Sequence, residues 1–297
     1  MSYAGSLQIG PLAFHCETAS GAFAIAPTGA YISFWHVGDT HDIDPPRIVL
    51  PLKKSVGKID LPSGVADFES GRNWKLCRRE GELIFAAGYA ERSRPERLCR
   101  VTSDLAHGEL LVDREALAQH PIPPRIQFPL AYPLDQILAW GMLSRIQGAL
   151  LHAALIVRPD GQGLLLAGRS GAGKSTLAAL CADAGWTVLN DDRALVHFED
   201  GRVLASGTPW HGSGKYAEPR TVPLAGMYFL AQSPTNHVQD ISRSEVLAEL
   251  LRVASLPVFL DDWCTPTLAT LDKLTRAIPL RRLHFRRDPS AVDALSG

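Results

Sequence analysis

The chain has 297 residues, of which 46% are hydrophobic and 21% charged, values typical of a folded globular protein. Its formal net charge is −1, which excludes a protein-wide basic field for holding nucleic acid or an anionic membrane. The five cysteines form no Cys-x-x-Cys pair and no Cys/His metal spacing, so neither a disulfide framework nor a zinc site is expected.

The start of the chain has no basic segment followed by an apolar one, and no apolar stretch is long enough to span a bilayer. Unpaired cysteines without a secretory signal are typical of cytoplasmic proteins. We therefore expect a cytoplasmic protein that binds neither membrane nor nucleic acid.

Residues 1–128 are predicted to form a smaller, β-rich region. A proline cluster at residues 121–124 indicates a linker or sharp turn near its end. The region has no motif of its own with chemical function, and a β-rich module can hold an extended peptide by strand addition, so we expect a role in binding an acceptor. Short strand-like segments occur at residues 23–25, 47–50, 82–86 and 109–112.

Strands and helices alternate in residues 129–297, which are predicted to form an α/β domain. Pro133 opens a helix whose apolar residues recur at helical spacing. Two buried strands follow, at residues 150–157 and Gly163–Ala167, and a helix at residues 175–184 is closed by Gly185. Further elements are expected in this order: a strand at residues 186–189, a hairpin of residues 194–198 and 202–205, a strand at 224–230, a helix at 242–253, a strand at 282–285 and a final helix from residue 289.

Between the strand Gly163–Ala167 and the helix after it, the sequence matches the phosphate-binding motif G-x-x-x-x-G-K-[ST]. Glycines leave room for backbone N–H groups to point at a phosphate chain, and the following helix directs its positive end at the same place. Lys174 is expected to reach the β- and γ-phosphates of ATP, and Ser175 to ligate Mg²⁺. The predicted nucleotide-binding residues are Gly168, Arg169, Ser170, Gly171, Ala172, Gly173, Lys174, Ser175 and Thr176.

Asp191 and Asp192 follow the next predicted strand, and strand ends at one edge of an α/β sheet face the same crevice. One carboxylate can hold Mg²⁺ while the other accepts a proton from an attacking hydroxyl. We assign Asp192, with Ser175, to the metal and test Asp191 first as the base, although the spacing does not decide which carboxylate is the base. The alternative is a surface turn, in which Asn-Asp-Asp is common.

These residues together resemble the catalytic domain of the HPr kinase/phosphorylase family, whose fold is related to phosphoenolpyruvate carboxykinase. The resemblance covers roughly residues 129–297 and depends on His152 with the Ala-Ala-Leu after it, the loop of residues 168–176, and the Asn-Asp-Asp-Arg of residues 190–193. It implies that Lys174 and Ser175 bind phosphate and metal and that the Asp pair abstracts a proton and binds metal. It also implies that His152, which by itself would be read as a core histidine, lies near the phosphates.

The resemblance implies an ATP-dependent kinase that acts on a serine of a protein or peptide, and related proteins phosphorylate peptide precursors of natural products. The family has an acidic residue where this chain has Thr176, and its Pro-Val-Arg-Pro-Gly stretch is missing here, so HPr itself is not expected as acceptor. Two alternatives stay open: a kinase for a small hydroxylated metabolite, and a non-catalytic ATP-dependent switch. The sequence does not decide between a monomer and a homo-oligomer.

Several weaker candidates have ordinary alternatives. The glycine-rich segment of residues 207–216 could close over a ligand, with Lys215 or Arg220 neutralising charge, or be a surface loop. Arg193 could steady the acidic pair. The basic residues 281–287 are interpreted as a strand with a solvated face, and the Asp-Asp of residues 261–262 as a solvated loop.

Overall fold

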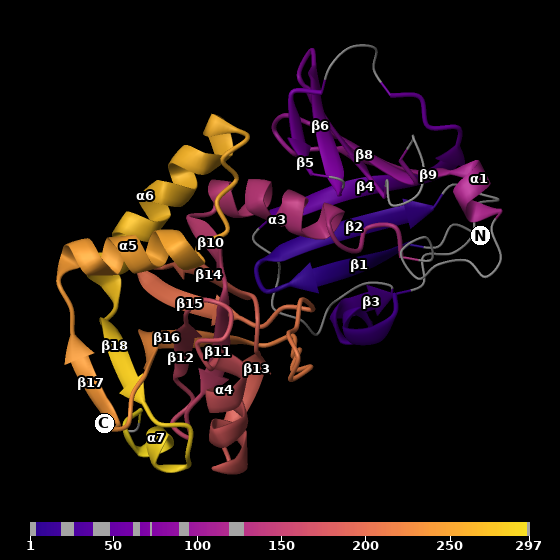
Figure 1. Ribbon diagram of the computed structural model, residues 1–297. Helices are drawn as coiled ribbons and strands as arrows, with labels where there is room; N and C mark the ends of the chain where they lie inside the picture. Colours follow the sequence, from indigo (N-terminus) through magenta and orange to yellow (C-terminus); the bar gives the residue numbers. More distant parts are fainter. Residues whose placement is uncertain are drawn as a thin grey trace. The chain divides into compact units, whose positions relative to one another are not determined.

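A computed structural model describes residues 4–18, 27–37, 48–61, 66–71, 73–88, 95–118 and 128–295 (Figure 1). Over these ranges the protein is mixed α/β with two nine-stranded sheets, which confirms the predicted α/β class. The chain divides into two compact units, Met1–Met142 and Leu143–Gly297. No helix in the described ranges is both long and apolar enough to cross a membrane.

The first unit is built on a sheet whose strand order is β3-β1-β2-β4-β9-β8-β7-β6-β5. Only the β2–β4 and β4–β9 pairs are parallel within it. The strands predicted at residues 82–86 and 109–112 are confirmed, whereas residues 23–25 and the proline cluster lie outside the described residues. The elements are β1 (Ala4–Ile9), β2 (Leu12–Thr18), η1 (Gly29–Phe34), β3 (Trp35–Val37), β4 (Ile48–Gly57), β5 (Phe68–Ser70), β6 (Trp74–Arg79), β7 (Glu82–Ala87), β8 (Arg97–Thr102), β9 (Gly108–Asp113) and α1 (Arg114–Leu117).

The division between the units falls inside helix α3 (Leu134–Arg145), later than the predicted boundary at residues 128/129. Buried Arg97 in β8 explains the shift, because its guanidinium donates to the carbonyls of Pro129, Ala131 and Tyr132. The carboxylate of Asp135 accepts a hydrogen bond from Tyr31 at 2.6 Å. These bonds fix the start of the predicted second domain to the first unit.

The second unit contains a sheet in the order β10-β14-β15-β16-β12-β11-β13, with β18 paired to both β16 and β17. The start of the long strand β16 pairs antiparallel with β15, and its later residues pair parallel with β12 and β18. The strands are β10 (Gly148–Leu151), β11 (Ala153–Val157), β12 (Gly163–Ala167), β13 (Thr187–Asn190), β14 (Ala194–Glu199), β15 (Arg202–Ser206), β16 (Thr221–Gln232), β17 (His237–Asp240) and β18 (Leu280–Phe285).

Helices cover both faces of this sheet, so the unit has three layers (Figure 1). Side chains alternate across each strand: Leu155 packs in one core with α5 and α6, whereas Ile156 packs in the other with α4 and α7. Both faces are therefore apolar, which explains the continuous hydrophobic runs of β11 and β12. The helices are α4 (Lys174–Asp183), α5 (Arg243–Val253), α6 (Asp261–Ala277) and α7 (Ser290–Asp293).

Most predicted elements of this unit are confirmed, but two predictions fail and one strand was not predicted. The single strand expected at residues 150–157 is two strands, because the chain bends at His152, whose N–H donates to the carbonyl of Val253. Residues 261–262 begin helix α6 instead of lying in a loop, although both side chains are exposed. The four-residue strand β17 was not predicted, since it has only one apolar residue, Val238.

Candidate active site

The sheet topology brings the predicted site residues to one edge. Strands β12, β13 and β18 run in the same direction, since β11 is antiparallel to both β12 and β13 and β18 is parallel with β16. The loop after β12 and the acidic pair after β13 therefore share an edge, as predicted from the sequence. His152 immediately precedes the antiparallel strand β11 and reaches the same edge from the opposite direction.

The loop between β12 and α4 requires glycine at particular positions. Gly171 and Gly173 have φ angles of +82° and +107°, in the left-handed region that side chains disfavour. A Cβ at Gly173 would lie 2.6 Å from Cζ of Phe285 in β18, so the aromatic ring also excludes a side chain there. The loop thus keeps a compact turn directly before the first residue of α4.

Lys174 begins α4 and turns its amine back over the loop. Only 7% of the residue is exposed, and Nζ donates to the carbonyls of Gly168 at 2.8 Å and Arg169 at 3.3 Å. Burial lowers the pKa of Lys174 below its ordinary value, and the carboxylates of Asp192 and Asp191 oppose that shift. The acidic pair therefore helps to keep the amine cationic although Lys174 is mostly buried.

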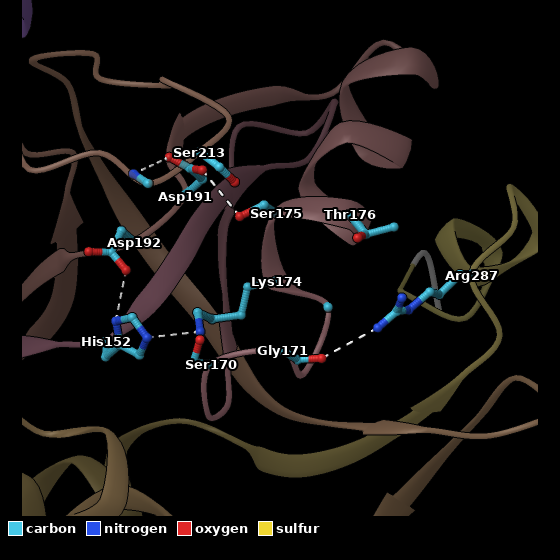
Figure 2. A pocket seen from close by; sticks show the side chains of 12 residues that line it. His152, Ser170, Gly171, Lys174, Ser175, Thr176, Asp191, Asp192, Ser213 and Arg287 are labelled. Carbon is cyan, nitrogen blue, oxygen red and sulfur yellow. Dashed lines mark hydrogen bonds and ion pairs between the residues drawn. The ribbon is translucent and has the colours of Figure 1, made fainter.

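His152 connects Lys174 to Asp192 (Figure 2). Its Nε2 is 3.0 Å from Nζ of Lys174, and its Nδ1 is 2.9 Å from Oδ1 of Asp192. Because the Lys174 amine donates to Nε2, the ring proton is assigned to Nδ1, the nitrogen on the side of the Asp192 carboxylate. Burial acts to raise the pKa of Asp192, but His152, Arg193 and Lys174 outweigh it and hold the pKa below its ordinary value.

The environment of Asp191 is different, because its carboxylate is saturated with donors. It is 1% exposed, and its two oxygens accept the backbone N–H groups of Gly212 and Gly214, each at 2.7 Å. The Ser175 hydroxyl donates to Oδ2 at 3.2 Å. Asp191 therefore fastens the glycine-rich loop to the start of α4, whereas the side chain of Asp192 is 31% exposed.

Asn190, the last residue of β13, holds the turn that carries both carboxylates. Its side-chain oxygen accepts the backbone N–H groups of Asp192 at 2.7 Å and Arg193 at 2.6 Å. Its amide nitrogen donates to the carbonyl of Thr208 at 2.9 Å and that of Trp210 at 3.3 Å. One fully buried amide thus fixes the acidic turn and the glycine-rich loop together. The sequence pattern includes Asn190 but does not predict this role.

Replacing Asn190 with alanine should lower the free energy of unfolding by about 3 kcal/mol, because several buried backbone groups would lose their partner. Denaturant-induced unfolding of both proteins measures the difference. The matched control is Asn236→Ala, whose contacts with Ser290 and Arg286 are exposed and which should change stability by less than about 1 kcal/mol. Equal effects of the two substitutions would contradict the role of Asn190.

These groups surround a cavity of about 340 Å³ at the start of α4 (Figure 2). Of the predicted nucleotide-binding residues, Arg169 and Ala172 do not line it, and Gly168 contributes only its carbonyl to Lys174. Lys215 and Arg220 are also not in its wall. The lining residues are His152, Ser170, Gly171, Gly173, Lys174, Ser175, Thr176, Asp191, Asp192, Gly212, Ser213 and Arg287.

Arg287 is the cavity residue that the sequence did not single out. It follows β18, and its Nη2 lies 3.4 Å from the carbonyl oxygen of Gly171, which also accepts a 2.9 Å bond from Gln232. The basic run of residues 281–287 was interpreted as a solvated strand face. Only the topology, with β18 ending beside the loop after β12, places its last arginine at the cavity.

The donor set also suits a hard cation beside a phosphate chain. The Ser175 hydroxyl and the Asp191 carboxylate lie together at one side of the cavity, and both are oxygen ligands. Mg²⁺ is usually bound by one or two such protein groups while phosphate and water oxygens complete its octahedron. These two residues therefore fit the oxygen ligands that a magnesium ion prefers.

The chain resembles known proteins over only part of its length. A family model described as SynChlorMet cassette protein ScmC matches residues 137–265, a range that includes His152, the loop of residues 168–176 and the acidic pair. The chain is similar to the structure of the Hpr(Ser) kinase/phosphatase from Coxiella burnetii, with 14% identity and a TM-score of 0.29, over 50% of this chain and 93% of that chain. No curated protein matches. We therefore infer a function from the residues of the site.

Proposed function

We propose that this protein is an ATP-dependent phosphotransferase that transfers the γ-phosphoryl group to a serine hydroxyl of a peptide or protein. The observation that carries the proposal is the convergence of Lys174, Ser175 and two differently held carboxylates on one cavity at the start of α4. A motif that matches by chance would not bring the acidic pair and the lysine to the same place.

Phosphate binding is supported by the loop and the helix start. The first N–H groups of α4 have no partners within the helix and carry a partial positive charge, which attracts an anion. Lys174 would exchange the carbonyls of Gly168 and Arg169 for phosphate oxygens, a stronger pairing because both partners are charged. ATP with Mg²⁺ supplies the γ-phosphoryl group, with the ion neutralising part of its charge.

The two carboxylates support different roles, opposite to those assigned from the sequence. Asp191 lies beside Ser175 with both oxygens engaged, which suits a place next to the metal and not a base. Asp192 is more exposed and is oriented by His152, which suits acceptance of a proton from the attacking hydroxyl. Because phosphoryl transfer has a loose transition state, orienting that hydroxyl matters more than a high basicity of Asp192.

A direct test of the nucleotide part is calorimetric titration of the full chain with MgATP. We expect saturable binding with a dissociation constant below about 1 mM, and weaker binding after EDTA removes Mg²⁺. No detectable heat at millimolar ATP would contradict the proposal. Binding with no transfer to any hydroxyl would instead favour the non-catalytic switch.

The acceptor is proposed on the family resemblance alone, which implies a peptide or protein serine but not HPr. The β-rich first unit, with its nine-stranded sheet, is our candidate for holding that acceptor. A serine peptide that this protein phosphorylates can be synthesised with a photoreactive group. On illumination it should cross-link to residues of the first unit. Cross-links only to residues 143–297 would remove the first unit from acceptor binding, and transfer only to a small alcohol would favour a metabolite kinase.

Arg287→Ala should weaken MgATP binding by about 3- to 10-fold, because an exposed arginine at the cavity contributes one screened charge. The effect should shrink as salt is raised. Arg286→Ala is the matched control, since Arg286 pairs with Asp288 and does not line the cavity. If both variants bind ATP equally well, Arg287 has no part in the site.

A further inference from the structure

We propose that Ser213 is an internal phosphate acceptor, so that the chain phosphorylates its own glycine-rich loop; this rests on the proposed function. Ser213 lies between β15 and β16 and lines the cavity with Lys174 and Ser175. Figure 2 shows its side chain next to Asp191, on the side of the cavity where Ser175 approaches. A serine hydroxyl is therefore already present where an acceptor serine would have to enter.

The backbone on both sides of Ser213 is fixed to the acidic pair. Gly212 and Gly214 each donate a 2.7 Å hydrogen bond to Asp191. A Cβ at Gly212 would lie 2.9 Å from Oδ2 of Asp191 and 3.3 Å from Cβ of Asp192, and one at Gly214 would lie 2.8 Å from the same Oδ2. The loop can pack this closely only because glycine flanks the serine, so the Gly-Ser-Gly backbone holds Ser213 beside the turn that carries the acidic pair.

The Ser213 hydroxyl has no structural role that competes with transfer. The residue is exposed, and its hydroxyl has no hydrogen-bond partner within the described part of the chain. Ser175, by contrast, donates to Asp191. The free hydroxyl is the one available to attack a phosphate.

The step balances with ATP as the donor. Oγ of Ser213 forms a bond to the γ-phosphorus, and the bond from that phosphorus to the bridging oxygen breaks, so ADP leaves with the electron pair. The hydroxyl proton passes to the carboxylate of Asp192 and then to water. No residue is oxidised or reduced.

The product should act against the site that makes it. Phosphoserine carries nearly two negative charges near neutral pH, and here they would lie beside Asp191 and Asp192. Like charges repel, so the loop should leave Asp191 and the cavity should become less attractive to a triphosphate. We expect the phosphorylated chain to bind MgATP at least about tenfold more weakly than the unmodified chain.

The test incubates the full chain, first treated with a phosphatase, with MgATP and no added acceptor, and maps phosphate by peptide mass spectrometry. We expect phosphate on Ser213 in the wild type, on residue 213 in Ser213→Thr, and none in Ser213→Ala or Asp192→Asn. The control Ser244→Ala, on the exposed first turn of α5, should be labelled normally. An internal reaction also proceeds with the same half-time when the protein is diluted.

Three results would overturn the inference. A chain that phosphorylates a peptide serine while Ser213 stays unmodified refutes it and leaves the proposed function standing. A Ser213→Ala variant that no longer binds MgATP would make Ser213 a nucleotide ligand instead of an acceptor. A wild-type chain that binds no MgATP refutes both the inference and the proposed function.

Discussion

Lys174→Ala should weaken MgATP binding by roughly 30- to 100-fold, which corresponds to about 2–3 kcal/mol for charged hydrogen bonds to phosphate. Lys174 is the lysine that lines the cavity, and its amine already lies 2.8 Å from a loop carbonyl at the start of α4. Alanine leaves backbone N–H groups to hold the phosphates alone. Calorimetric titration of both proteins measures the loss.

The matched control is Lys215→Ala, an exposed lysine of the neighbouring loop that does not line the cavity. It should bind MgATP as the wild type does. Thermal unfolding of Lys174→Ala checks that the fold survives, since Lys174 also bonds to the loop. A folded Lys174→Ala protein with wild-type affinity for MgATP would show that Lys174 does not bind the phosphates.

Asp192→Asn should keep MgATP binding and lose transfer by about 10²- to 10⁴-fold, the usual contribution of a positioned base. The amide nearly matches the carboxylate in shape but cannot accept the hydroxyl proton. Rates of transfer to a serine peptide under saturating ATP separate this loss from a loss of affinity.

Asp191→Asn provides the contrast within the same turn. Asp191 accepts a hydrogen bond from Ser175 and holds the loop through Gly212 and Gly214. Replacing its carboxylate with the amide of asparagine should therefore mainly raise the Mg²⁺ concentration needed for activity. If Asp191→Asn abolishes transfer without changing the metal requirement, while Asp192→Asn stays active, the roles are those first assigned from the sequence.

Much of the second unit could be predicted from local sequence. The strand Gly163–Ala167 was predicted with its observed bounds, because a run buried on both faces is uniformly apolar. The helix α5 begins with a capping box of Ser242 and Glu245, which marks its start in the sequence. Helix α6 was missed because residues 261–262 were interpreted as part of a proline-containing loop. Pro266 lies inside the helix, where proline removes a backbone hydrogen bond, so the local sequence disfavours a helix there.

The site was predicted in composition but not in its contacts. The acidic pair and Lys174 were expected at one edge, since parallel strand ends meet there. Which carboxylate faces which partner depends on the turn held by Asn190 and on the return of residues 207–216, both set by tertiary hydrogen bonds. Arg287 reaches the cavity only through the position of β18 in the sheet, which no local pattern encodes.

The central claim is transfer of the γ-phosphoryl group to serine, and the most direct measurement uses ATP labelled in that group. The full chain is incubated with Mg²⁺, labelled ATP and a library of serine peptides, beside a second library in which alanine replaces each serine. We expect label in phosphoserine from the first library only, and none with Asp192→Asn. Label that stays in ATP, or appears only as inorganic phosphate, while the protein demonstrably binds MgATP would contradict it.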